Sequence, residues 1–86
     1  MKTKVYCAVE KTWCGTHSQL AETSLISAHV WEHDAEKAAK ARYNELKACR
    51  DVSFSEWSEF EGVRGLVRNN VASKSIYVVE REIELD

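Results

Sequence analysis

Two pairs of nitrogen and sulfur ligands have the spacing most typical of a chemical site. Cys14 and His17 form a Cys-x2-His pair, and His29 and His33 form a His-x3-His pair. Four such ligands suit a tetrahedral zinc ion. However, alternating apolar residues predict a strand around His29, and residues four apart on a strand lie about 13 Å apart, too far for one zinc ion. A shared zinc site therefore requires a helix that begins near residue 27, or a bend at His33.

The same residues do not assemble the parts of an enzyme. A histidine close to Cys14 would activate its thiol as a nucleophile. The surrounding sequence supplies neither a carboxylate to orient that histidine nor donors for an oxyanion hole. The three glycines are too far apart for a phosphate-binding loop. We therefore expect a protein that is not an enzyme and needs no cofactor, with a small zinc-binding interaction module as the alternative.

A lysine stripe is a candidate binding surface on the predicted helix. Lys37, Lys40 and Lys47 share one side of that helix and could meet phosphates or an acidic protein surface. A solvated helix face is the alternative explanation of the same stripe. No aromatic residues interleave with these lysines, which argues against binding of a single-stranded nucleic acid.

Acidic residues near the C-terminus form a second charged row. Glu80, Glu82 and Glu84 alternate along the last predicted strand, where their carboxylates could imitate nucleic-acid phosphates in front of a basic groove. The formal net charge of the chain is -2, so nothing attracts the whole molecule to nucleic acid. These observations favour a protein partner over direct contact with nucleic acid.

The composition is that of an ordinary globular protein, with 44% hydrophobic and 30% charged residues. No apolar run approaches the roughly 20 residues of a membrane span, and the N-terminal sequence lacks the apolar region of a signal peptide. Three cysteines, an odd number, are typical of a reducing compartment. We expect one domain over residues 1–86, located in the cytoplasm and without membrane contact.

The hydrophobic period predicts the elements that position these residues. Strict alternation predicts strands over residues 4–12 and 25–33, and a third over residues 75–85. Apolar residues at helical spacing, with Asp34 as N-cap, predict a helix over residues 34–50.

The segment that follows satisfies the rules for a second helix start. Ser53 and Glu56 have the spacing of a capping box, and Val52 and Trp57 stand where a hydrophobic staple would place them. We expect a short helical segment over residues 54–60. The predicted fold is then α+β, with an antiparallel sheet of about three strands, one main helix and this short extra helical segment, in the order β-β-α-α-β.

An exposed aromatic row is predicted on the outward face of the second strand. Trp31 lies there between His29 and His33. Since an indole is costly to leave in water, we expect residues 54–67 to cover Trp31. If Trp31 is exposed instead, it would be the anchor of an interface.

Three segments resemble a group of small uncharacterised phage and bacterial proteins. Those proteins begin with a Lys-Val-Tyr strand, pass from a strand into a helix that contains Glu-Lys-Ala, and end on an acidic strand. The matching segments are residues 4–6, 28–38 and 80–86, which are 21 of the 86 residues. The resemblance implies a compact mixed α/β domain without known catalysis, encoded by a phage or mobile element, and assigns no functional residue. Anti-CRISPR proteins are similar in kind, although no motif here marks one.

The sequence therefore predicts a small non-enzymatic protein-binding domain. It would dock onto a larger host protein, such as a CRISPR or other defence component, and inhibit or modulate it. A nucleic-acid-associated regulator that uses the lysine stripe is a further alternative, and an edge strand leaves room for a homodimer. The candidate partner-binding residues are His29, Trp31, His33, Lys37, Lys40, Lys47, Glu80, Glu82 and Glu84.

Overall fold

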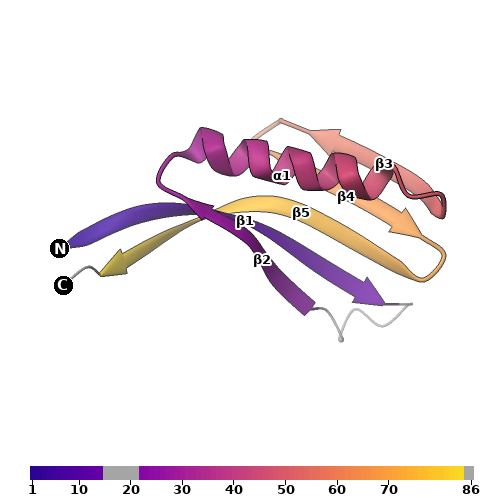
Figure 1. Cartoon of the computed structure of the whole chain (residues 1–86), viewed down its shortest axis with the longest axis horizontal. Helices are drawn as coiled ribbons and strands as arrows, with labels where there is room; N and C mark the ends of the chain where they lie inside the picture. Colours follow the sequence, from indigo (N-terminus) through magenta and orange to yellow (C-terminus); the bar gives the residue numbers. More distant parts are fainter. Residues whose placement is uncertain (15–21, 85–86) are drawn as a thin grey trace.

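The centre of the protein is a long antiparallel pair of strands, β1 (Lys2–Cys14) and β5 (Ala72–Glu84), in the computed structural model (Figure 1). β2 (Glu22–His29) pairs with the other edge of β1. On the far side, β4 (Arg64–Asn69) pairs with β5, and β3 (Val52–Ser58) pairs with β4. Every pairing is antiparallel, and the strand order is β2-β1-β5-β4-β3.

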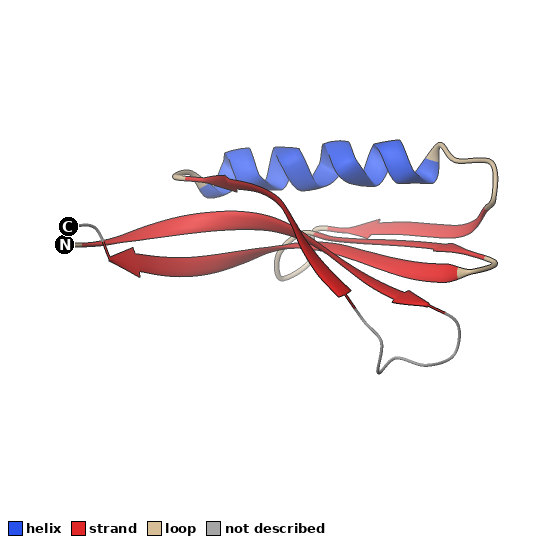
Figure 2. Cartoon of the chain, turned by 60° about the horizontal axis from the view of Figure 1, so that its bottom comes forward, coloured by secondary structure: helices blue, strands red, loops and turns tan. Residues whose placement is uncertain are grey.

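α1 (Glu32–Lys47) lies along one face of this sheet, as Figures 1 and 2 show from two directions. The structure describes residues 1–14 and 22–84, and within these ranges no element covers the opposite face. Among the same residues, no helix has the length and apolar character that a membrane crossing requires. We call the face under α1 the helix side and the opposite face the open face.

The core lies between α1 and the middle of the sheet. Ala35, Ala39 and Tyr43 recur every four residues along α1, and all three are buried. Ala39 and Tyr43 pack with residues of β1, β4 and β5, which are Ala8, Val67 and Ile76. The small alanine side chains let α1 lie close to the sheet, and the strand face that they contact is the one that α1 covers.

The predicted three-stranded sheet with two helices is wrong, because residues 52–58 form strand β3 instead of a second helix. The capping-box spacing is present, but the hydroxyl of Ser53 donates to the carbonyl of Arg68 on β4, at 3.2 Å. A helix cap contributes only about 1 kcal/mol, less than a full strand pairing and the packing of Trp57 can supply. Across residues 1–14 and 22–84, the fold is therefore one helix on one five-stranded antiparallel sheet.

Gly65 on β4 provides the space for two aromatic rings. Tyr43 of α1 and Trp57 of β3 pack together with their ring centroids 5.2 Å apart. A Cβ atom on Gly65 would lie 2.8 Å from Cδ1 of Tyr43 and 3.0 Å from Cε3 of Trp57, closer than normal carbon contacts. Trp57 therefore packs against the core as a strand residue, and the missing side chain makes this packing feasible.

A β-bulge in β2 changes which residues face α1. Ile26 has no partner in the register with β1, and it packs against the core on the helix side. Ala28 consequently lies on the open face, opposite Cys7. The strict alternation predicted for this strand, which placed Ile26 and Ala28 on one face, is therefore wrong.

α1 begins at Glu32, two residues before the predicted start at Asp34. The N-cap is Trp31, whose backbone is extended and whose side chain makes no capping hydrogen bond. Its carbonyl accepts hydrogen bonds from the amides of Asp34 and Ala35, at 3.2 and 3.3 Å. Asp34 thus lies in the first turn, where its carboxylate favours the positive end of the helix dipole.

Glu10 is a buried carboxylate that joins α1 to the sheet. Its residue is 7% exposed, and it accepts hydrogen bonds from Arg42 Nε at 2.6 Å and from Lys74 Nζ at 3.1 Å. Burial raises the pKa of the Glu10 carboxyl, but the hydrogen bonds and charges of Arg42 and Lys74 outweigh it, so this pKa lies below its ordinary value. Three elements, α1, β1 and β5, are tied together by this one side chain.

Candidate binding face of the sheet

The predicted zinc ligands do not form a site in the part of the chain that the structure describes. His29 Nε2 is hydrogen-bonded to the hydroxyl of Ser27 at 2.7 Å, and His33 is exposed on the first turn of α1. His17 and the side chain of Cys14 lie outside the described residues. Among the described residues, no group of three or more His, Cys, Asp or Glu side chains could hold a metal ion.

Trp31 and the two histidines do not form the predicted outward row. His29 is half-buried on the helix side of the sheet, whereas His33 belongs to α1. Trp31 is 71% exposed, so the prediction that residues 54–67 cover it is wrong. Because its indole is exposed, Trp31 remains a candidate contact residue. It does not share a surface with His29 and His33.

Replacing Trp31 with alanine is expected to change the free energy of unfolding by less than about 0.5 kcal/mol, as for other exposed positions. The reason is that the indole is mostly in water, and that the hydrogen bonds from Asp34 and Ala35 go to the backbone carbonyl of Trp31, which alanine keeps. Urea denaturation of W31A and the parent protein measures the difference. A loss above about 2 kcal/mol would show that the indole belongs to the core.

The acidic row on β5 is already balanced by basic groups on β1. Glu80 and Glu82 form ion pairs with Lys4 at 3.2 Å and Lys2 at 3.4 Å. The hydrogen bond and charge of Glu80 raise the pKa of Lys4. Glu84 lies 4.0 Å from the N-terminal amine. Carboxylates paired in this way are weaker imitations of a phosphate row than the sequence suggested.

Two members of the lysine stripe lie over aromatic rings. Lys40 Nζ is 4.5 Å from the ring centroid of Trp57 and 5.3 Å from that of Tyr43, and Lys47 Nζ is 5.3 Å from the Tyr43 centroid. Lys37 is exposed. The stripe therefore helps to cover the Tyr43–Trp57 pair, whereas Lys37 makes neither a ring contact nor an ion pair with the described residues.

Aromatic and basic side chains gather instead on the open face, a surface that sequence reasoning missed. The register places Trp13 of β1, Ser73 of β5, Arg68 of β4 and Phe54 of β3 in one row across the sheet. Tyr77 of β5 lies two rows away on the same face, since side chains two residues apart on a strand share a face. Three aromatic rings thus lie on one surface that no described helix covers.

Among the described strand residues, four cations share this face with a single carboxylate. Lys11, Arg64, Arg68 and Arg81 lie on the open face by the register of their strands, and the carboxylate is Glu56. None of the four cations has an ion pair with another described residue. By contrast, Lys2, Lys4, Arg42 and Lys74 on the helix side are all paired. A chain with a net charge of -2 therefore has one positively charged face.

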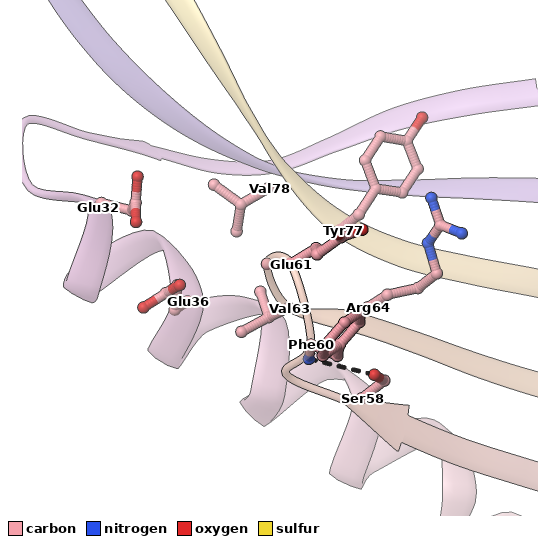
Figure 3. Close-up of a pocket in the computed structure, with 10 residues that line it drawn as sticks. Glu32, Glu36, Ser58, Phe60, Glu61, Val63, Arg64, Tyr77 and Val78 are labelled. Carbon is pink, nitrogen blue, oxygen red and sulfur yellow. Dashed lines mark hydrogen bonds between the residues drawn. The ribbon is translucent and has the colours of Figure 1, made fainter.

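The basic and aromatic groups of the open face are in contact with each other. Lys11 Nζ lies 5.5 Å from the Trp13 ring centroid, and Arg68 Cζ lies 5.8 Å from that of Phe54. Arg64 pairs directly with Tyr77 across β4 and β5. Figure 3 shows the Arg64 guanidinium and the Tyr77 ring pointing together away from α1. Each ring therefore has a cation beside it.

The rest of the open face carries mostly aliphatic side chains, with Arg81 between Val79 and Ile83 on β5. Cys7 and Val79 are a directly opposed pair, and Leu25 and Ile83 lie on the same face, 64% and 41% exposed. Half-buried and exposed aliphatic side chains in this arrangement are typical of a contact surface for another macromolecule.

A cavity of about 560 Å³ lies where β4 begins, between α1, the β3–β4 turn and β5 (Figure 3). Glu32 and Glu36 of α1 and Glu61 of the turn line it, together with Arg64. The backbone turns sharply here, with positive φ angles at Glu61 (57°) and Gly62 (107°). The cavity is acidic and lies beside the first residues of β5 that have no β4 partner.

No protein-family model, no curated protein and no solved structure matches this chain. The resemblance to small phage and bacterial proteins therefore stays a prediction, and function has to be inferred from the residues of the structure.

Proposed function

We propose that this protein is a non-enzymatic binding domain whose open face binds single-stranded nucleic acid. The observation that carries the proposal is the combination of three aromatic rings with four cations that are unpaired among the described residues, on one face of an antiparallel sheet. Aromatic side chains on a sheet stack with unpaired bases, while basic side chains beside them meet the phosphates.

The spacing of the rings suits an extended strand of several nucleotides. Trp13 and Phe54 are at the two ends of one row, three strand spacings apart, which corresponds to about 14 Å. Lys11, Arg64 and Arg68 lie between or beside the rings, where they would neutralise the backbone of the bound strand. Base faces in a duplex are stacked against each other, so a sheet face with one exposed ring, Phe54, and two half-buried rings, Trp13 and Tyr77, favours the unpaired bases of single strands.

The first prediction of this proposal concerns charge on the open face. A fluorescein-labelled 12-nucleotide single strand, titrated at about 50 mM salt and followed by fluorescence polarisation, should bind the parent protein. Replacing Arg64 and Arg68 together by glutamine should weaken binding at least tenfold and lower the slope of log K against log salt by about 0.7 for each cation removed.

Lys37→Gln is the matched control, because it removes one exposed cation from the helix stripe. It should leave the affinity within about twofold. A larger effect of Lys37→Gln than of the arginine variant would place the site on α1, and an unchanged affinity of the arginine variant would contradict the proposal.

Docking onto a larger host protein is the second candidate, and the aliphatic side chains of the open face favour it. Leu25, Ile83 and the Cys7–Val79 pair could form the centre of an interface with a protein whose rim is acidic. Failure to bind any single strand at low salt would favour this candidate. Such a domain could act as an inhibitor by occupying a functional surface, for which about 800 Å² on each partner suffices.

A further inference from the structure

β5 continues beyond its pairing with Arg64, the first residue of β4, and the edge of β5 on that side is free from there on. β4 pairs with residues 73–77 of β5, whereas β1 pairs with β5 over its whole length. Over residues 78–84, no strand within the described residues lies on the β4 side, so every second residue points its backbone N–H and C=O groups outward there. Figure 2 shows β1 and β5 extending as a two-stranded ribbon beyond the sheet.

The free part of β5 is more regular than the two edge strands of the sheet. The edge strands β2 and β3 each contain a break in register, at Ile26 and Ser53. Bulges of this kind protect edges against pairing with further strands. β5 keeps one register with β1 from the Lys2–Glu84 pair to the Cys14–Ala72 pair, without a break. The edge of β1 over residues 2–5 is also free and unbroken, and the overhang of β5 differs from it in lying beside the cavity lined by Val78.

The cavity at the start of β4 adds a side-chain pocket to this edge of β5. Val78 is the first residue of β5 beyond the β4 pairing, and it lines the cavity together with Glu32, Glu36 and Glu61. Figure 3 shows Glu32 and Glu36 projecting from α1 at the cavity, on the helix side of β5. None of the three carboxylates has an ion pair with a described residue. A side chain on the helix side of an added strand would therefore meet unpaired negative charge.

We propose that the β5 overhang accepts an extended segment of a partner protein, which adds as a further strand and places a lysine or arginine side chain in the cavity. Backbone hydrogen bonds to residues 78–84 would supply affinity, and the cavity would supply specificity. On the open face the added strand would lie beside Val79, Arg81 and Ile83, which favours apolar residues at alternate positions. The site uses the edge of the sheet and is independent of nucleic acid on the open face.

A second copy of this chain fits the edge less well. Antiparallel pairing of two β5 overhangs would place the row of Glu80, Glu82 and Glu84 beside the same row of the other copy. Like charges at opposed positions destabilise a strand pair. The exposed ion pairs of Glu80 and Glu82 with Lys4 and Lys2 offset this repulsion only in part. A foreign strand with alternating basic residues avoids this repulsion and is the occupant that the charges favour.

The probe for this site is a labelled octapeptide of alternating lysine and valine, tested with the full-length protein. Binding is measured by fluorescence polarisation, and its location by hydrogen–deuterium exchange of backbone amides. We expect slower exchange in residues 78–84 and at least tenfold weaker binding of a glutamate–valine peptide. Two further peptides, N-methylated at all lysines or at all valines, have equal charge but block opposite edges of the peptide. Strand addition predicts that their affinities differ at least tenfold.

Glu32→Gln combined with Glu36→Gln should weaken peptide binding three- to tenfold, while Glu22→Gln, at the far end of the sheet, should have no effect. The proposal is overturned if both N-methylated peptides bind as well as the parent peptide, if protection appears on β2 or β3, or if the peptide does not bind. Peptide binding without nucleic-acid binding, or the reverse, separates this proposal from that for the open face.

Discussion

Replacing Glu10 by glutamine is expected to reduce the free energy of unfolding by about 2–3 kcal/mol. Glutamine keeps the shape of the side chain but leaves Arg42 and Lys74 without their shared carboxylate. Breaking a fully buried ion pair costs about 3–5 kcal/mol. We expect less, because the side chains of Arg42 and Lys74 are 31% and 28% exposed and can be partly rehydrated. Urea denaturation at pH 7 measures the difference.

Glu45→Gln provides the control for this substitution. Glu45 also pairs with Arg42, at 2.7 Å, but its side chain is 71% exposed, so its loss should cost less than about 1 kcal/mol. Equal losses of unfolding free energy for the two variants would show that the burial of Glu10 does not strengthen its ion pairs with Arg42 and Lys74.

The same carboxylate predicts the direction of the pH dependence. Because the folded-state pKa of Glu10 is lowered, the unfolded chain takes up the proton first as the pH falls. The stability that Glu10 contributes is therefore fully present above its ordinary pKa of 4.5 and is lost as the pH falls from there through the folded-state pKa. The difference between the parent protein and E10Q should shrink between pH 5 and the acid range, and a difference that grows would contradict the assignment.

Local hydrophobic period was sufficient to find the longer elements of the fold. The strands predicted over residues 4–12 and 75–85 lie within β1 and almost wholly within β5, and the helix over residues 34–50 overlaps α1 for most of its length. Their apolar residues recur over several turns or several alternations. α1 starts two residues earlier than predicted because its N-cap, Trp31, makes no side-chain capping hydrogen bond and so carries no capping signature in the sequence.

β3 and β4 were missed because their signals are short and depend on each other. Ser53 and Glu56 satisfied a local helix rule, and Gly65 weakened any regular pattern in the next segment. The structure shows that Gly65 serves packing, since it makes room for Tyr43 and Trp57. A contact between three elements far apart in sequence leaves no local period from which it could be predicted.

The candidate binding face depended on those two missing strands. Arg64, Leu66 and Arg68 are spaced two residues apart, which is the strand period. This spacing would have placed both arginines on one face had residues 64–69 been assigned as a strand. Interleaving of aromatic and basic residues was considered only along the helix stripe. On the open face the interleaving runs across strands, so only the register reveals it.

Replacing Tyr43 by alanine is expected to cost about 3–5 kcal/mol, as for other buried aromatic residues. Tyr43 is 4% exposed and packs between Gly65, Trp57 and the core. Its loss leaves a hole next to a glycine that has no side chain to fill it. Phe60→Ala is the control, since Phe60 is 82% exposed and its removal should change stability by less than about 0.5 kcal/mol.

The contact between Tyr43 and Gly65 can be tested separately from the cost of the hole. Gly65→Ala should destabilise the parent protein by about 1–3 kcal/mol, because the new Cβ atom meets both rings. In the Tyr43→Ala background the same Cβ atom meets only Trp57, so Gly65→Ala should cost less there. Urea denaturation of the two single variants and the double variant gives the coupling energy between the sites. Strictly additive losses would contradict the close approach of the Tyr43 ring to β4.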